Sequence, residues 1–339
     1  MLPFIKNKSF AIDLGNNNTL LTDEQQILLA QPSFIVFDEE KHAVKAVGDE
    51  AYQIFEKNHE QLKPVKPLRW GVIADYESAS QMINQLVGRV YKKNWFTSFD
   101  HIVSGVPYCT TEVERRALRD ALDQFNSKKT HLVFEPLAAA VGMGLNIREP
   151  EGKMVIDIGG GITEIVIISL SGVATFQSIK TAGDSFTEEI QDYFRRSHNL
   201  AIGWKTAEQV KIQVGAALPG LKNAPAPMQV KGKDIMEGIP VTRQINHEEV
   251  AFVLDKSIKT IEQSIIQTLE VCPPELAADI YQNGIHLTGG SALLRGMSER
   301  LQKTIQLPVH LDEQPLLSVS KGISQVLRDP KKYQSILFE

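Results

Sequence analysis

The residues of this sequence that are best suited to chemistry are an aspartate and the glycines that follow it. Residues 154–170 read MVIDIGGGITEIVIISL, in which Asp157 ends an apolar run and precedes three glycines: Gly159, Gly160 and Gly161. Glycine has no Cβ, so backbone N–H groups in such a turn can approach an anion closely. The pattern favours a phosphate site beside a carboxylate, although a purely structural turn would have the same sequence.

The residues after these glycines exclude two common nucleotide-binding motifs. A dinucleotide-binding turn opens into a helix, but residues 162–168 form a mostly β-branched run that prefers a strand. The phosphate loop G-x-x-x-x-G-K-[ST] is also missing from the sequence. We therefore expect a hairpin here and not a strand-to-helix turn.

A second copy of the pattern lies near the start of the chain. Residues 10–21 read FAIDLGNNNTLL, and aligning Asp13 with Asp157 also aligns Thr19 with Thr163. An internal repeat of this kind is evidence of architecture. Two hairpins with a carboxylate at each tip could close on one polyphosphate. Mg²⁺ suits such a site because it takes one or two carboxylates together with phosphate oxygens.

Length and composition indicate a two-domain protein of ordinary globular type. The chain has 339 residues, which exceeds the roughly 250–300 at which single cores stop growing. A net charge of −5 gives no reason to expect nucleic-acid binding. The 2 cysteines have neither metal-site spacing nor a disulfide framework, and no run is long enough for a membrane span or a signal peptide. We therefore expect a cytoplasmic protein.

Strand and helix patterns alternate along the chain, which indicates α/β layers. Apolar residues recur at helical spacing in 79–90 and 250–269, and residues 101–106 have the pattern of a strand. Thr111 and Glu114 have the spacing of a capping box. We interpret both apolar stripes as core packing.

Two further turns could contribute to a site. Glu135 precedes Pro136 after a short apolar strand, which predicts a strand-to-helix turn. A carboxylate there can face a cleft, or it can simply complement the helix dipole. Residues 283–297, NGIHLTGGSALLRGM, predict a strand, a glycine turn and a helix whose first N–H groups can meet a phosphate or a nucleoside.

Six segments together resemble the bacterial actins of the MreB family over essentially the whole chain: IDLGNNNT, FEPLAAA, DIGGGITEIVIISLSG, TAEQVKIQVG, PPELAADI and LTGGSALLRG. The related sugar kinases and heat-shock chaperones share the two hairpins but not the last two segments at this length. The resemblance implies an actin-like fold: two α/β domains, each with a smaller subdomain, and ATP with Mg²⁺ in the cleft between them. It also implies homopolymeric filaments that bind the inner face of the cell membrane and act with cell-wall synthesis and shape proteins.

The resemblance also implies roles for individual residues. It places Asp13 and Asp157 at the metal, and Glu135 where the family positions the water that attacks the γ-phosphate. The other contacts that it implies to ATP come from the two turns, from a pair beside the ribose and base, and from a closing turn: Gly15, Asn16, Asn17, Asn18, Gly159, Gly160, Gly161, Glu208, Lys211, Gly289, Gly290 and Ser291.

The resemblance further implies four subdomains, with boundaries that we expect as follows: 1–33, 70–145 and 318–339 in IA; 34–69 in IB; 146–181 and 247–317 in IIA; and 182–246 in IIB.

Some residues depart from the family pattern. Asn16 and Asn17 replace Thr and Ala of the usual GTANT, Ile162 replaces a Thr, Phe134 an acid, and Ser291 a third glycine. The predicted metal and water carboxylates all remain. The family's hydroxyl at position 162 and its acid at position 134 are both missing, which leaves fewer polar groups to hold the attacking water. We therefore expect nucleotide binding with slow ATP hydrolysis. A non-hydrolysing, ATP-bound scaffold and a small-molecule kinase of the same superfamily are the alternative functions.

One segment has the composition of a membrane contact. Residues 91–100, YKKNWFTSFD, place two lysines beside three aromatic residues: Trp95, Phe96 and Phe99. Rings at headgroup level next to cations suit a lipid interface, and the family carries a membrane-contacting loop in this region. Alternatively, the rings fold back onto the core. Residues 1–8, MLPFIKNK, are a second candidate anchor.

Overall fold

The computed structural model describes residues 8–57, 60–91 and 98–338. The chain divides into two compact units. The first comprises residues 1–150, 168–172 and 316–339, and the second comprises 151–167 and 173–315. Each unit contains one of the two aspartate–glycine repeats. The finer division into four subdomains stays a prediction.

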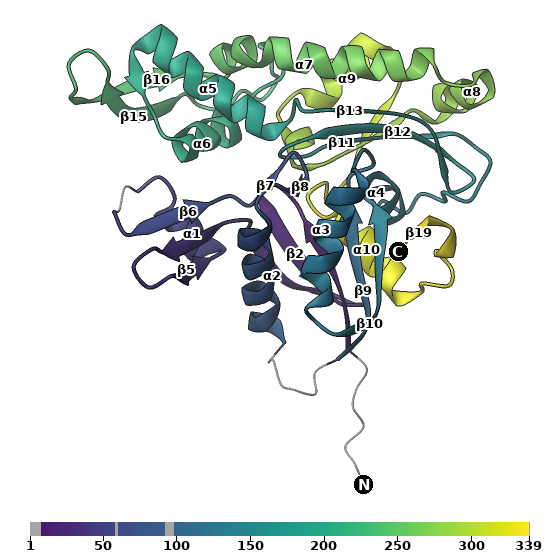
Figure 1. The fold of residues 1–339 in the computed structure, drawn as a ribbon. Helices are drawn as coiled ribbons and strands as arrows, with labels where there is room; N and C mark the ends of the chain where they lie inside the picture. The colour runs from purple at the N-terminus through teal and green to yellow at the C-terminus, as the bar shows by residue number, and fades with distance from the viewer. Residues whose placement is uncertain (1–7, 58–59, 92–97, 339) are drawn as a thin grey trace. The chain divides into compact units, whose positions relative to one another are not determined.

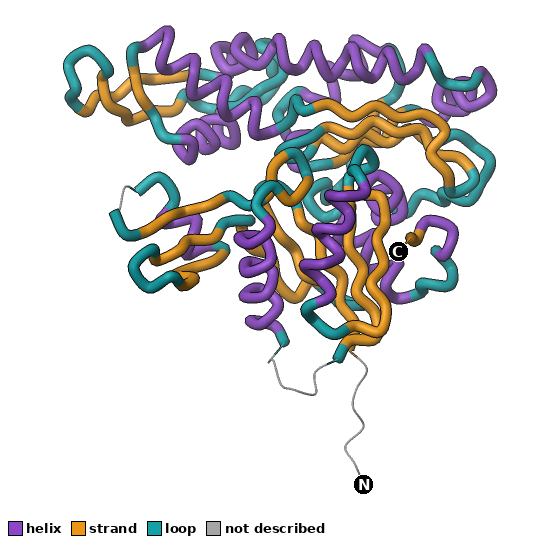
Figure 2. The backbone as a smooth tube through the Cα atoms, in the orientation of Figure 1, coloured by secondary structure: helices purple, strands orange, loops and turns teal. Residues whose placement is uncertain are grey.

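The first unit is built on a six-stranded sheet in the order β19-β10-β9-β1-β2-β3, shown in Figures 1 and 2. Its strands are β1 (Lys8–Leu14), β2 (Asn18–Thr22), β3 (Ile27–Pro32), β9 (Phe99–Val106), β10 (Ser127–Phe134) and β19 (Leu337–Phe338). Its helices are α2 (Tyr76–Val90), α3 (Glu112–Asp123), α4 (Glu135–Gly142), α10 (Ser318–Arg328) and the 3₁₀ turn η2 (Gln334–Ile336).

A small three-stranded sheet in the order β5-β4-β6 extends this unit, with α1 beside it and the pair β7–β8 following. Phe34 and Val36 lie at the centre of its own small core. The bounds of these elements are β4 (Ile35–Asp38), β5 (Ala43–Val47), α1 (Asp49–Ile54), β6 (Leu62–Val65), β7 (Leu68–Arg69) and β8 (Val72–Ile73).

The second unit is built on a five-stranded sheet in the order β13-β12-β11-β17-β18 (Figure 1). Its strands are β11 (Lys153–Ile158), β12 (Thr163–Ser169), β13 (Gly172–Ile179), β17 (Ile285–Thr288) and β18 (Val309–Leu311). Its helices are α5 (Gly183–His198), α6 (Trp204–Val214), α7 (His247–Glu270), α8 (Pro274–Asn283), the 3₁₀ turn η1 (Gly290–Leu293) and α9 (Met297–Ile305). A smaller sheet contains β14 (Leu200–Ala201), β15 (Met228–Asp234) and β16 (Pro240–Ile245).

The two large sheets repeat one topology. In each, the aspartate-bearing strand, β1 or β11, has the second strand of its hairpin on one side. On the other side it pairs in parallel with a strand from later in the chain, β9 or β17, which in turn pairs in parallel with β10 or β18. The internal repeat of the sequence therefore corresponds to a repeat of strand order.

The elements predicted from hydrophobic spacing are confirmed. Helices α2 and α7 bury the predicted stripes, and β9 contains the predicted strand 101–106. The Thr111 hydroxyl accepts from the Glu114 amide at 3.3 Å, and the Glu114 carboxylate accepts from the Thr111 amide at 2.7 Å, which completes the capping box of α3. None of the helices among the described residues has the length and apolar character required to cross a bilayer.

Glycines allow α4 and α10 to pack backbone against backbone in the first unit. A Cβ on Gly322 of α10 would overlap the carbonyl oxygen of Ala138 in α4, and a Cβ on Gly142 would overlap the carbonyl oxygen of Ser318. A backbone atom cannot rotate away as the end of a side chain can. This contact fixes the position of α10 relative to the first residue of α4, Glu135.

The helix contact predicts opposite effects for two Gly→Ala substitutions. Gly322→Ala should lower the free energy of unfolding by at least the roughly 1–3 kcal/mol of core overpacking. Gly88→Ala is the matched control, because Gly88 lies in α2 with no atom within 4 Å of the added Cβ. It should raise the stability by about 0.5–1 kcal/mol. Urea denaturation of the two variants measures both effects, and an unchanged midpoint for Gly322→Ala would show that α4 and α10 do not pack this closely.

Candidate nucleotide site

The hairpin of the first unit ends in a buried carboxylate. Asp13 lies near the end of β1, and only 9% of its surface is exposed. The Ser320 hydroxyl, in the first turn of α10, donates to Asp13 Oδ2 at 3.1 Å. Burial raises the pKa of Asp13 from its ordinary value of 3.8 to about 6, and the Ser320 hydrogen bond offsets part of that rise.

The raised pKa of Asp13 has a direct consequence for stability. Since the folded value lies above the unfolded one, the folded state binds the proton more tightly, and stability falls as pH rises from about 4 to 6. Above pH 6 the fold therefore holds an ionised carboxylate at a cost. A cation beside the carboxylate would remove that cost, which is the electrostatic behaviour expected of a metal ligand.

Ser33, in the connection between β3 and β4, anchors the turn after Asp13 by hydrogen bonds. The Ser33 hydroxyl donates to the Gly15 carbonyl at 2.7 Å and lies 2.9 Å from Thr19 Oγ1. The Ser33 amide donates to the Asn17 carbonyl at 2.9 Å. Asn16 accepts through Oδ1 from the Gly71 amide at 2.9 Å.

The helix that begins with Glu135 and the strand that carries Asp13 both pack against α10. Glu135 is the first residue of α4, and its Cγ lies 3.1 Å from the position that a Cβ on Gly105 would take. Val319, beside Ser320 in α10, packs 3.5 Å from the same position. The strand-to-helix turn predicted for Glu135 is confirmed.

The hairpin of the second unit is anchored in a similar way by different residues. The Gly159 amide donates to the Ile162 carbonyl at 3.0 Å and closes the turn. The Ser291 hydroxyl donates to the Gly159 carbonyl at 2.7 Å. The hydroxyl of Thr163, the counterpart of Thr19 in the repeat, donates to the Thr181 carbonyl at 2.7 Å.

The carbonyls of this second turn face the start of α5. The Gly159 carbonyl also accepts from the Gly183 amide at 3.1 Å, and the Gly160 carbonyl accepts from the Asp184 amide at 2.6 Å. The amides of Gly160 and Gly161 donate to no protein acceptor within the described part of the chain. These two N–H groups are thus available to an anion.

Asp157 is backed by a glycine that no other residue could replace. It pairs with Thr288 at the ends of β11 and β17. Gly289 follows with φ +89°, and a Cβ there would overlap Asp157 Oδ1 and the Ile158 carbonyl. The Gly289 amide donates to the Pro315 carbonyl at 3.1 Å. Gly290 and Ser291 then begin the short 3₁₀ turn η1, and the helix that the sequence predicted after the glycine turn is α9, which starts at Met297.

Glu208 and Lys211 of α6 form an ion pair of 2.7 Å, and both side chains are largely buried. Lys211 Nζ also donates to the Gly183 carbonyl at 2.8 Å and to Thr187 Oγ1 at 3.0 Å. A Cβ on Gly183 would lie 3.3 Å from Lys211 Nζ and would collide with Ser291 Oγ. The pair predicted beside ribose and base therefore lies close to the second turn and to Ser291.

These side chains fit a magnesium ion that is shared with phosphates. A protein cage for a metal would need several converging ligands, and no group of three or more His, Cys, Asp or Glu side chains converges in residues 8–57, 60–91 and 98–338. Each unit has one aspartate of the repeat, and a single carboxylate suits an ion whose other ligands are phosphate oxygens and water.

Two departures from the family pattern have a structural role. Ser291 supplies the hydroxyl that binds Gly159, which a glycine could not do. Phe134 packs on Tyr108 and Phe338 at centroid distances of 4.6 and 4.5 Å.

The membrane prediction for Phe99 is wrong for this structure. Phe99 is 3% exposed, and its ring packs edge-on against Phe10 at 4.9 Å and against Tyr91 at 5.1 Å. Its place in β9 turns it into the core of the first unit. Trp95 and Phe96, the other two residues of that prediction, lie outside the described residues.

Sequence reasoning missed the residues that support the two turns from elsewhere in the chain. Ser33, Ser320, Thr187 and Gly183 belong to no motif that the sequence analysis identified. Gly183 had a usable signal, because a glycine at the start of a helix lets backbone amides approach an anion closely.

Known proteins match the sequence of this chain over nearly its whole length. The family model described as MreB/Mbl protein matches residues 7–335. The cell shape-determining protein MreB of Escherichia coli K12 is 36% identical over 326 residues, covering 95% of this chain and 93% of that one. The cell shape-determining protein Mbl of Bacillus subtilis 168 is also 36% identical, covering 96% and 97%.

Solved structures give the same fold. MreB5 of Spiroplasma citri bound to AMPPNP superposes with a TM-score of 0.91 at 34% identity, covering 96% of this chain and 98% of that one. A MamK double helical filament shares the fold, with a TM-score of 0.75 at 19% identity over 95% and 99% of the two chains. The predicted actin-like fold is thereby confirmed, and this chain belongs to the MreB/Mbl family of bacterial actins.

Proposed function

We propose that this protein is an ATP-dependent, actin-like cytoskeletal protein that assembles into filaments at the inner face of the cell membrane. The filaments would organise cell-wall synthesis and maintain cell shape. Nucleotide binding is supported mainly by the matched anchoring of the two glycine turns. The Ser33 hydroxyl donates to the Gly15 carbonyl and the Ser291 hydroxyl donates to the Gly159 carbonyl, both at 2.7 Å.

The comparisons support nucleotide binding and a role in determining cell shape. The Spiroplasma citri relative was crystallised with AMPPNP and with ADP, at 34% and 33% identity to this chain. The Escherichia coli and Bacillus subtilis relatives are named for cell-shape determination. Filament assembly is supported by membership of the MreB/Mbl family of bacterial actins.

The proposed mechanism assigns a different task to each group of residues. Backbone amides of Gly15, Asn16, Asn17 and Asn18 in one unit, and of Gly159, Gly160 and Gly161 in the other, would donate to the phosphates of ATP. Asp13 and Asp157 would hold Mg²⁺, which when bound neutralises the phosphate charge. Glu208 and Lys211 would lie at the ribose and base, with Gly289, Gly290 and Ser291 closing over the nucleoside.

Glu135 would orient the water that attacks the γ-phosphate. Phosphoryl transfer of this type depends mainly on positioning and electrostatics. The position of Glu135 depends on the start of α4, which the glycine contact with α10 fixes relative to Asp13. Ile162 and Phe134 supply no polar group to the water, so hydrolysis should be slow.

Membrane binding is proposed for Trp95 and Phe96 together with the N-terminal residues 1–8, and Phe99 is excluded because it is buried. A filament presents many copies of a weak contact, so avidity can make binding firm. The double variant Trp95→Ala, Phe96→Ala should lose liposome co-sedimentation and still form filaments in solution. Undiminished co-sedimentation would move the anchor to another segment.

Removal of either metal carboxylate should weaken nucleotide binding. Asp13→Ala and Asp157→Ala should each reduce the affinity for Mg²⁺-AMPPNP by about tenfold or more, since each removes a charged ligand of the ion. Titration calorimetry measures this. Asp120→Ala is the control, because Asp120 lies in α3 with a half-exposed side chain and a surface ion pair to Arg116 at 3.8 Å. Parental affinity in both site variants would refute the site.

Removal of Glu135 should separate binding from hydrolysis. Glu135→Ala should bind AMPPNP as the parent does and release phosphate from ATP roughly 10²–10⁴-fold more slowly, the range typical of a positioned acid or base. The assay is run without any sugar acceptor, so that phosphate release also distinguishes an ATPase from a kinase.

The exposed Glu112 of α3 gives the control variant, Glu112→Ala. Phosphate release that is equal in the parent and in Glu135→Ala would exclude Glu135 from the reaction. Filaments that pellet with AMPPNP while the parent shows no turnover would instead establish the non-hydrolysing scaffold.

A further inference from the structure

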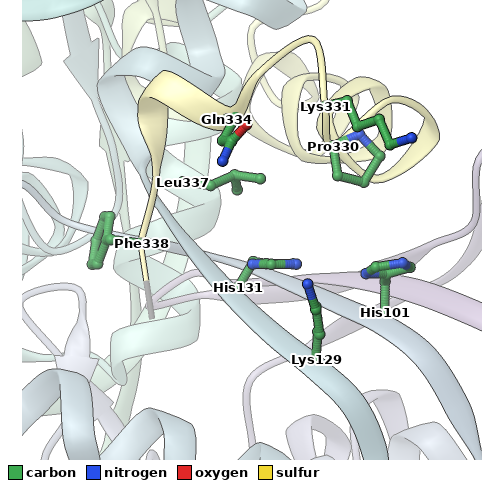
Figure 3. A pocket seen from close by; sticks show the side chains of 8 residues that line it. All are labelled: His101, Lys129, His131, Pro330, Lys331, Gln334, Leu337 and Phe338. Atoms are coloured by element: carbon green, nitrogen blue, oxygen red, sulfur yellow. The ribbon is translucent and has the colours of Figure 1, made fainter.

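A cavity of about 490 Å³ lies in the first unit, between the sheet and the last residues of the described chain. Its floor is formed by β9 and β10, and residues 330–338 cover it (Figure 3). It lies toward the start of these two strands, whereas Glu135 follows the end of β10. The cavity is therefore separate from the carboxylates of the nucleotide site.

The floor of the cavity carries positive charge. His101 of β9 pairs in register with Lys129 of β10, and His131 lies two residues farther along β10. Side chains two residues apart on a strand share a face, so all three line the cavity together. Lys331 lies at the rim, and none of the described lining residues is acidic.

The two histidines are arranged as a stacked pair with an unsatisfied nitrogen. Their ring centroids are 5.6 Å apart and the rings are 15° from parallel. Figure 3 shows the Lys129 side chain pointing up between them. His101 Nδ1 is buried and has no hydrogen-bond partner. That nitrogen has almost no accessible surface, so His101 lines the cavity with the rest of its ring.

The chemistry of the lining favours an anion over a cation. The ammonium group of Lys129 would repel a metal ion at the histidine pair, and nearly parallel rings do not direct their nitrogens to one point. Two acids that lie next to lining residues in the sequence have other partners: Asp100 is paired with Lys128 at 2.5 Å, and Asp329 accepts from the Lys332 amide at 3.1 Å.

The opposite wall is mainly apolar. Leu337, Phe338 and Pro330 contribute it, and Figure 3 shows Leu337 and Gln334 reaching toward His131 from the covering segment. The volume lies within the range of roughly 300–1,000 Å³ of small-molecule sites and is far larger than a single phosphate needs. An occupant should therefore combine an anionic head with an apolar body.

We propose that this cavity binds a small organic phosphate monoester. Its phosphate would lie at His101, Lys129 and His131, and its apolar part against Leu337 and Phe338. A phosphate has three acceptor oxygens spread around the phosphorus, so it can accept from several donors that do not point at one atom. This site is independent of the proposed nucleotide site.

The probe for the test is phenyl phosphate, added to the full chain that has first been saturated with Mg²⁺-AMPPNP. We expect saturable binding near millimolar concentration, with shifts of the His101 and His131 ring resonances in NMR spectra. Inorganic phosphate should bind about tenfold more weakly, because it lacks the apolar part. Lys129→Ala and His101→Phe should each weaken phenyl phosphate binding by about tenfold.

Lys332→Ala is the matched control, since Lys332 has the same charge and lies next to the cavity without lining it. It should bind phenyl phosphate as the parent does. His101→Phe keeps an aromatic ring in the stack, so the fold is expected to survive that change. The proposal is overturned if phenyl phosphate produces no shifts at these histidines, or if Lys129→Ala and Lys332→Ala bind it equally. Binding only to phosphatidic acid in vesicles, and not to phenyl phosphate, would equally overturn it.

Discussion

The burial of the Asp13 carboxylate is the constraint on which the first unit depends. An ionised group without much water is costly, and the raised pKa of about 6 expresses that cost. One hydroxyl, from Ser320, compensates part of it, so α10 must approach β1 closely. That approach in turn requires the glycine contact between α10 and α4. The helix that begins with Glu135 is thereby held in a fixed relation to the strand that ends with Asp13.

The second unit anchors its glycine turn in a similar way, but with different residues. In both turns a serine holds the carbonyl of the first glycine from behind, but Ser33 follows its hairpin closely whereas Ser291 comes from a turn far along the chain. The threonines of the repeat, Thr19 and Thr163, are fully buried in both units and bind different partners. The duplicated element is therefore the strand with its turn, and its supports differ.

The sequence predicted well what depends on local pattern. The repeat, the capping box of α3, the stripe of α7 and the turn at Glu135 all follow from short-range rules, and the structure contains them. It did not predict Ser320 or Ser33 as partners, because hydrogen bonds between distant segments depend on packing. Phe99 was misassigned for a related reason. An aromatic beside lysines has the composition of a membrane contact, but its position in β9 turns the ring into the core.

The central claim is that the two aspartates of the repeat serve one metal–nucleotide site. The most direct test is a double-mutant cycle on Mg²⁺-AMPPNP affinity, with Asp13→Ala, Asp157→Ala and the double variant. If both carboxylates hold the same ion, the loss of one already releases it, and the double variant should bind little worse than the weaker single variant. Losses that simply add would show that the two aspartates act independently, and would contradict the account.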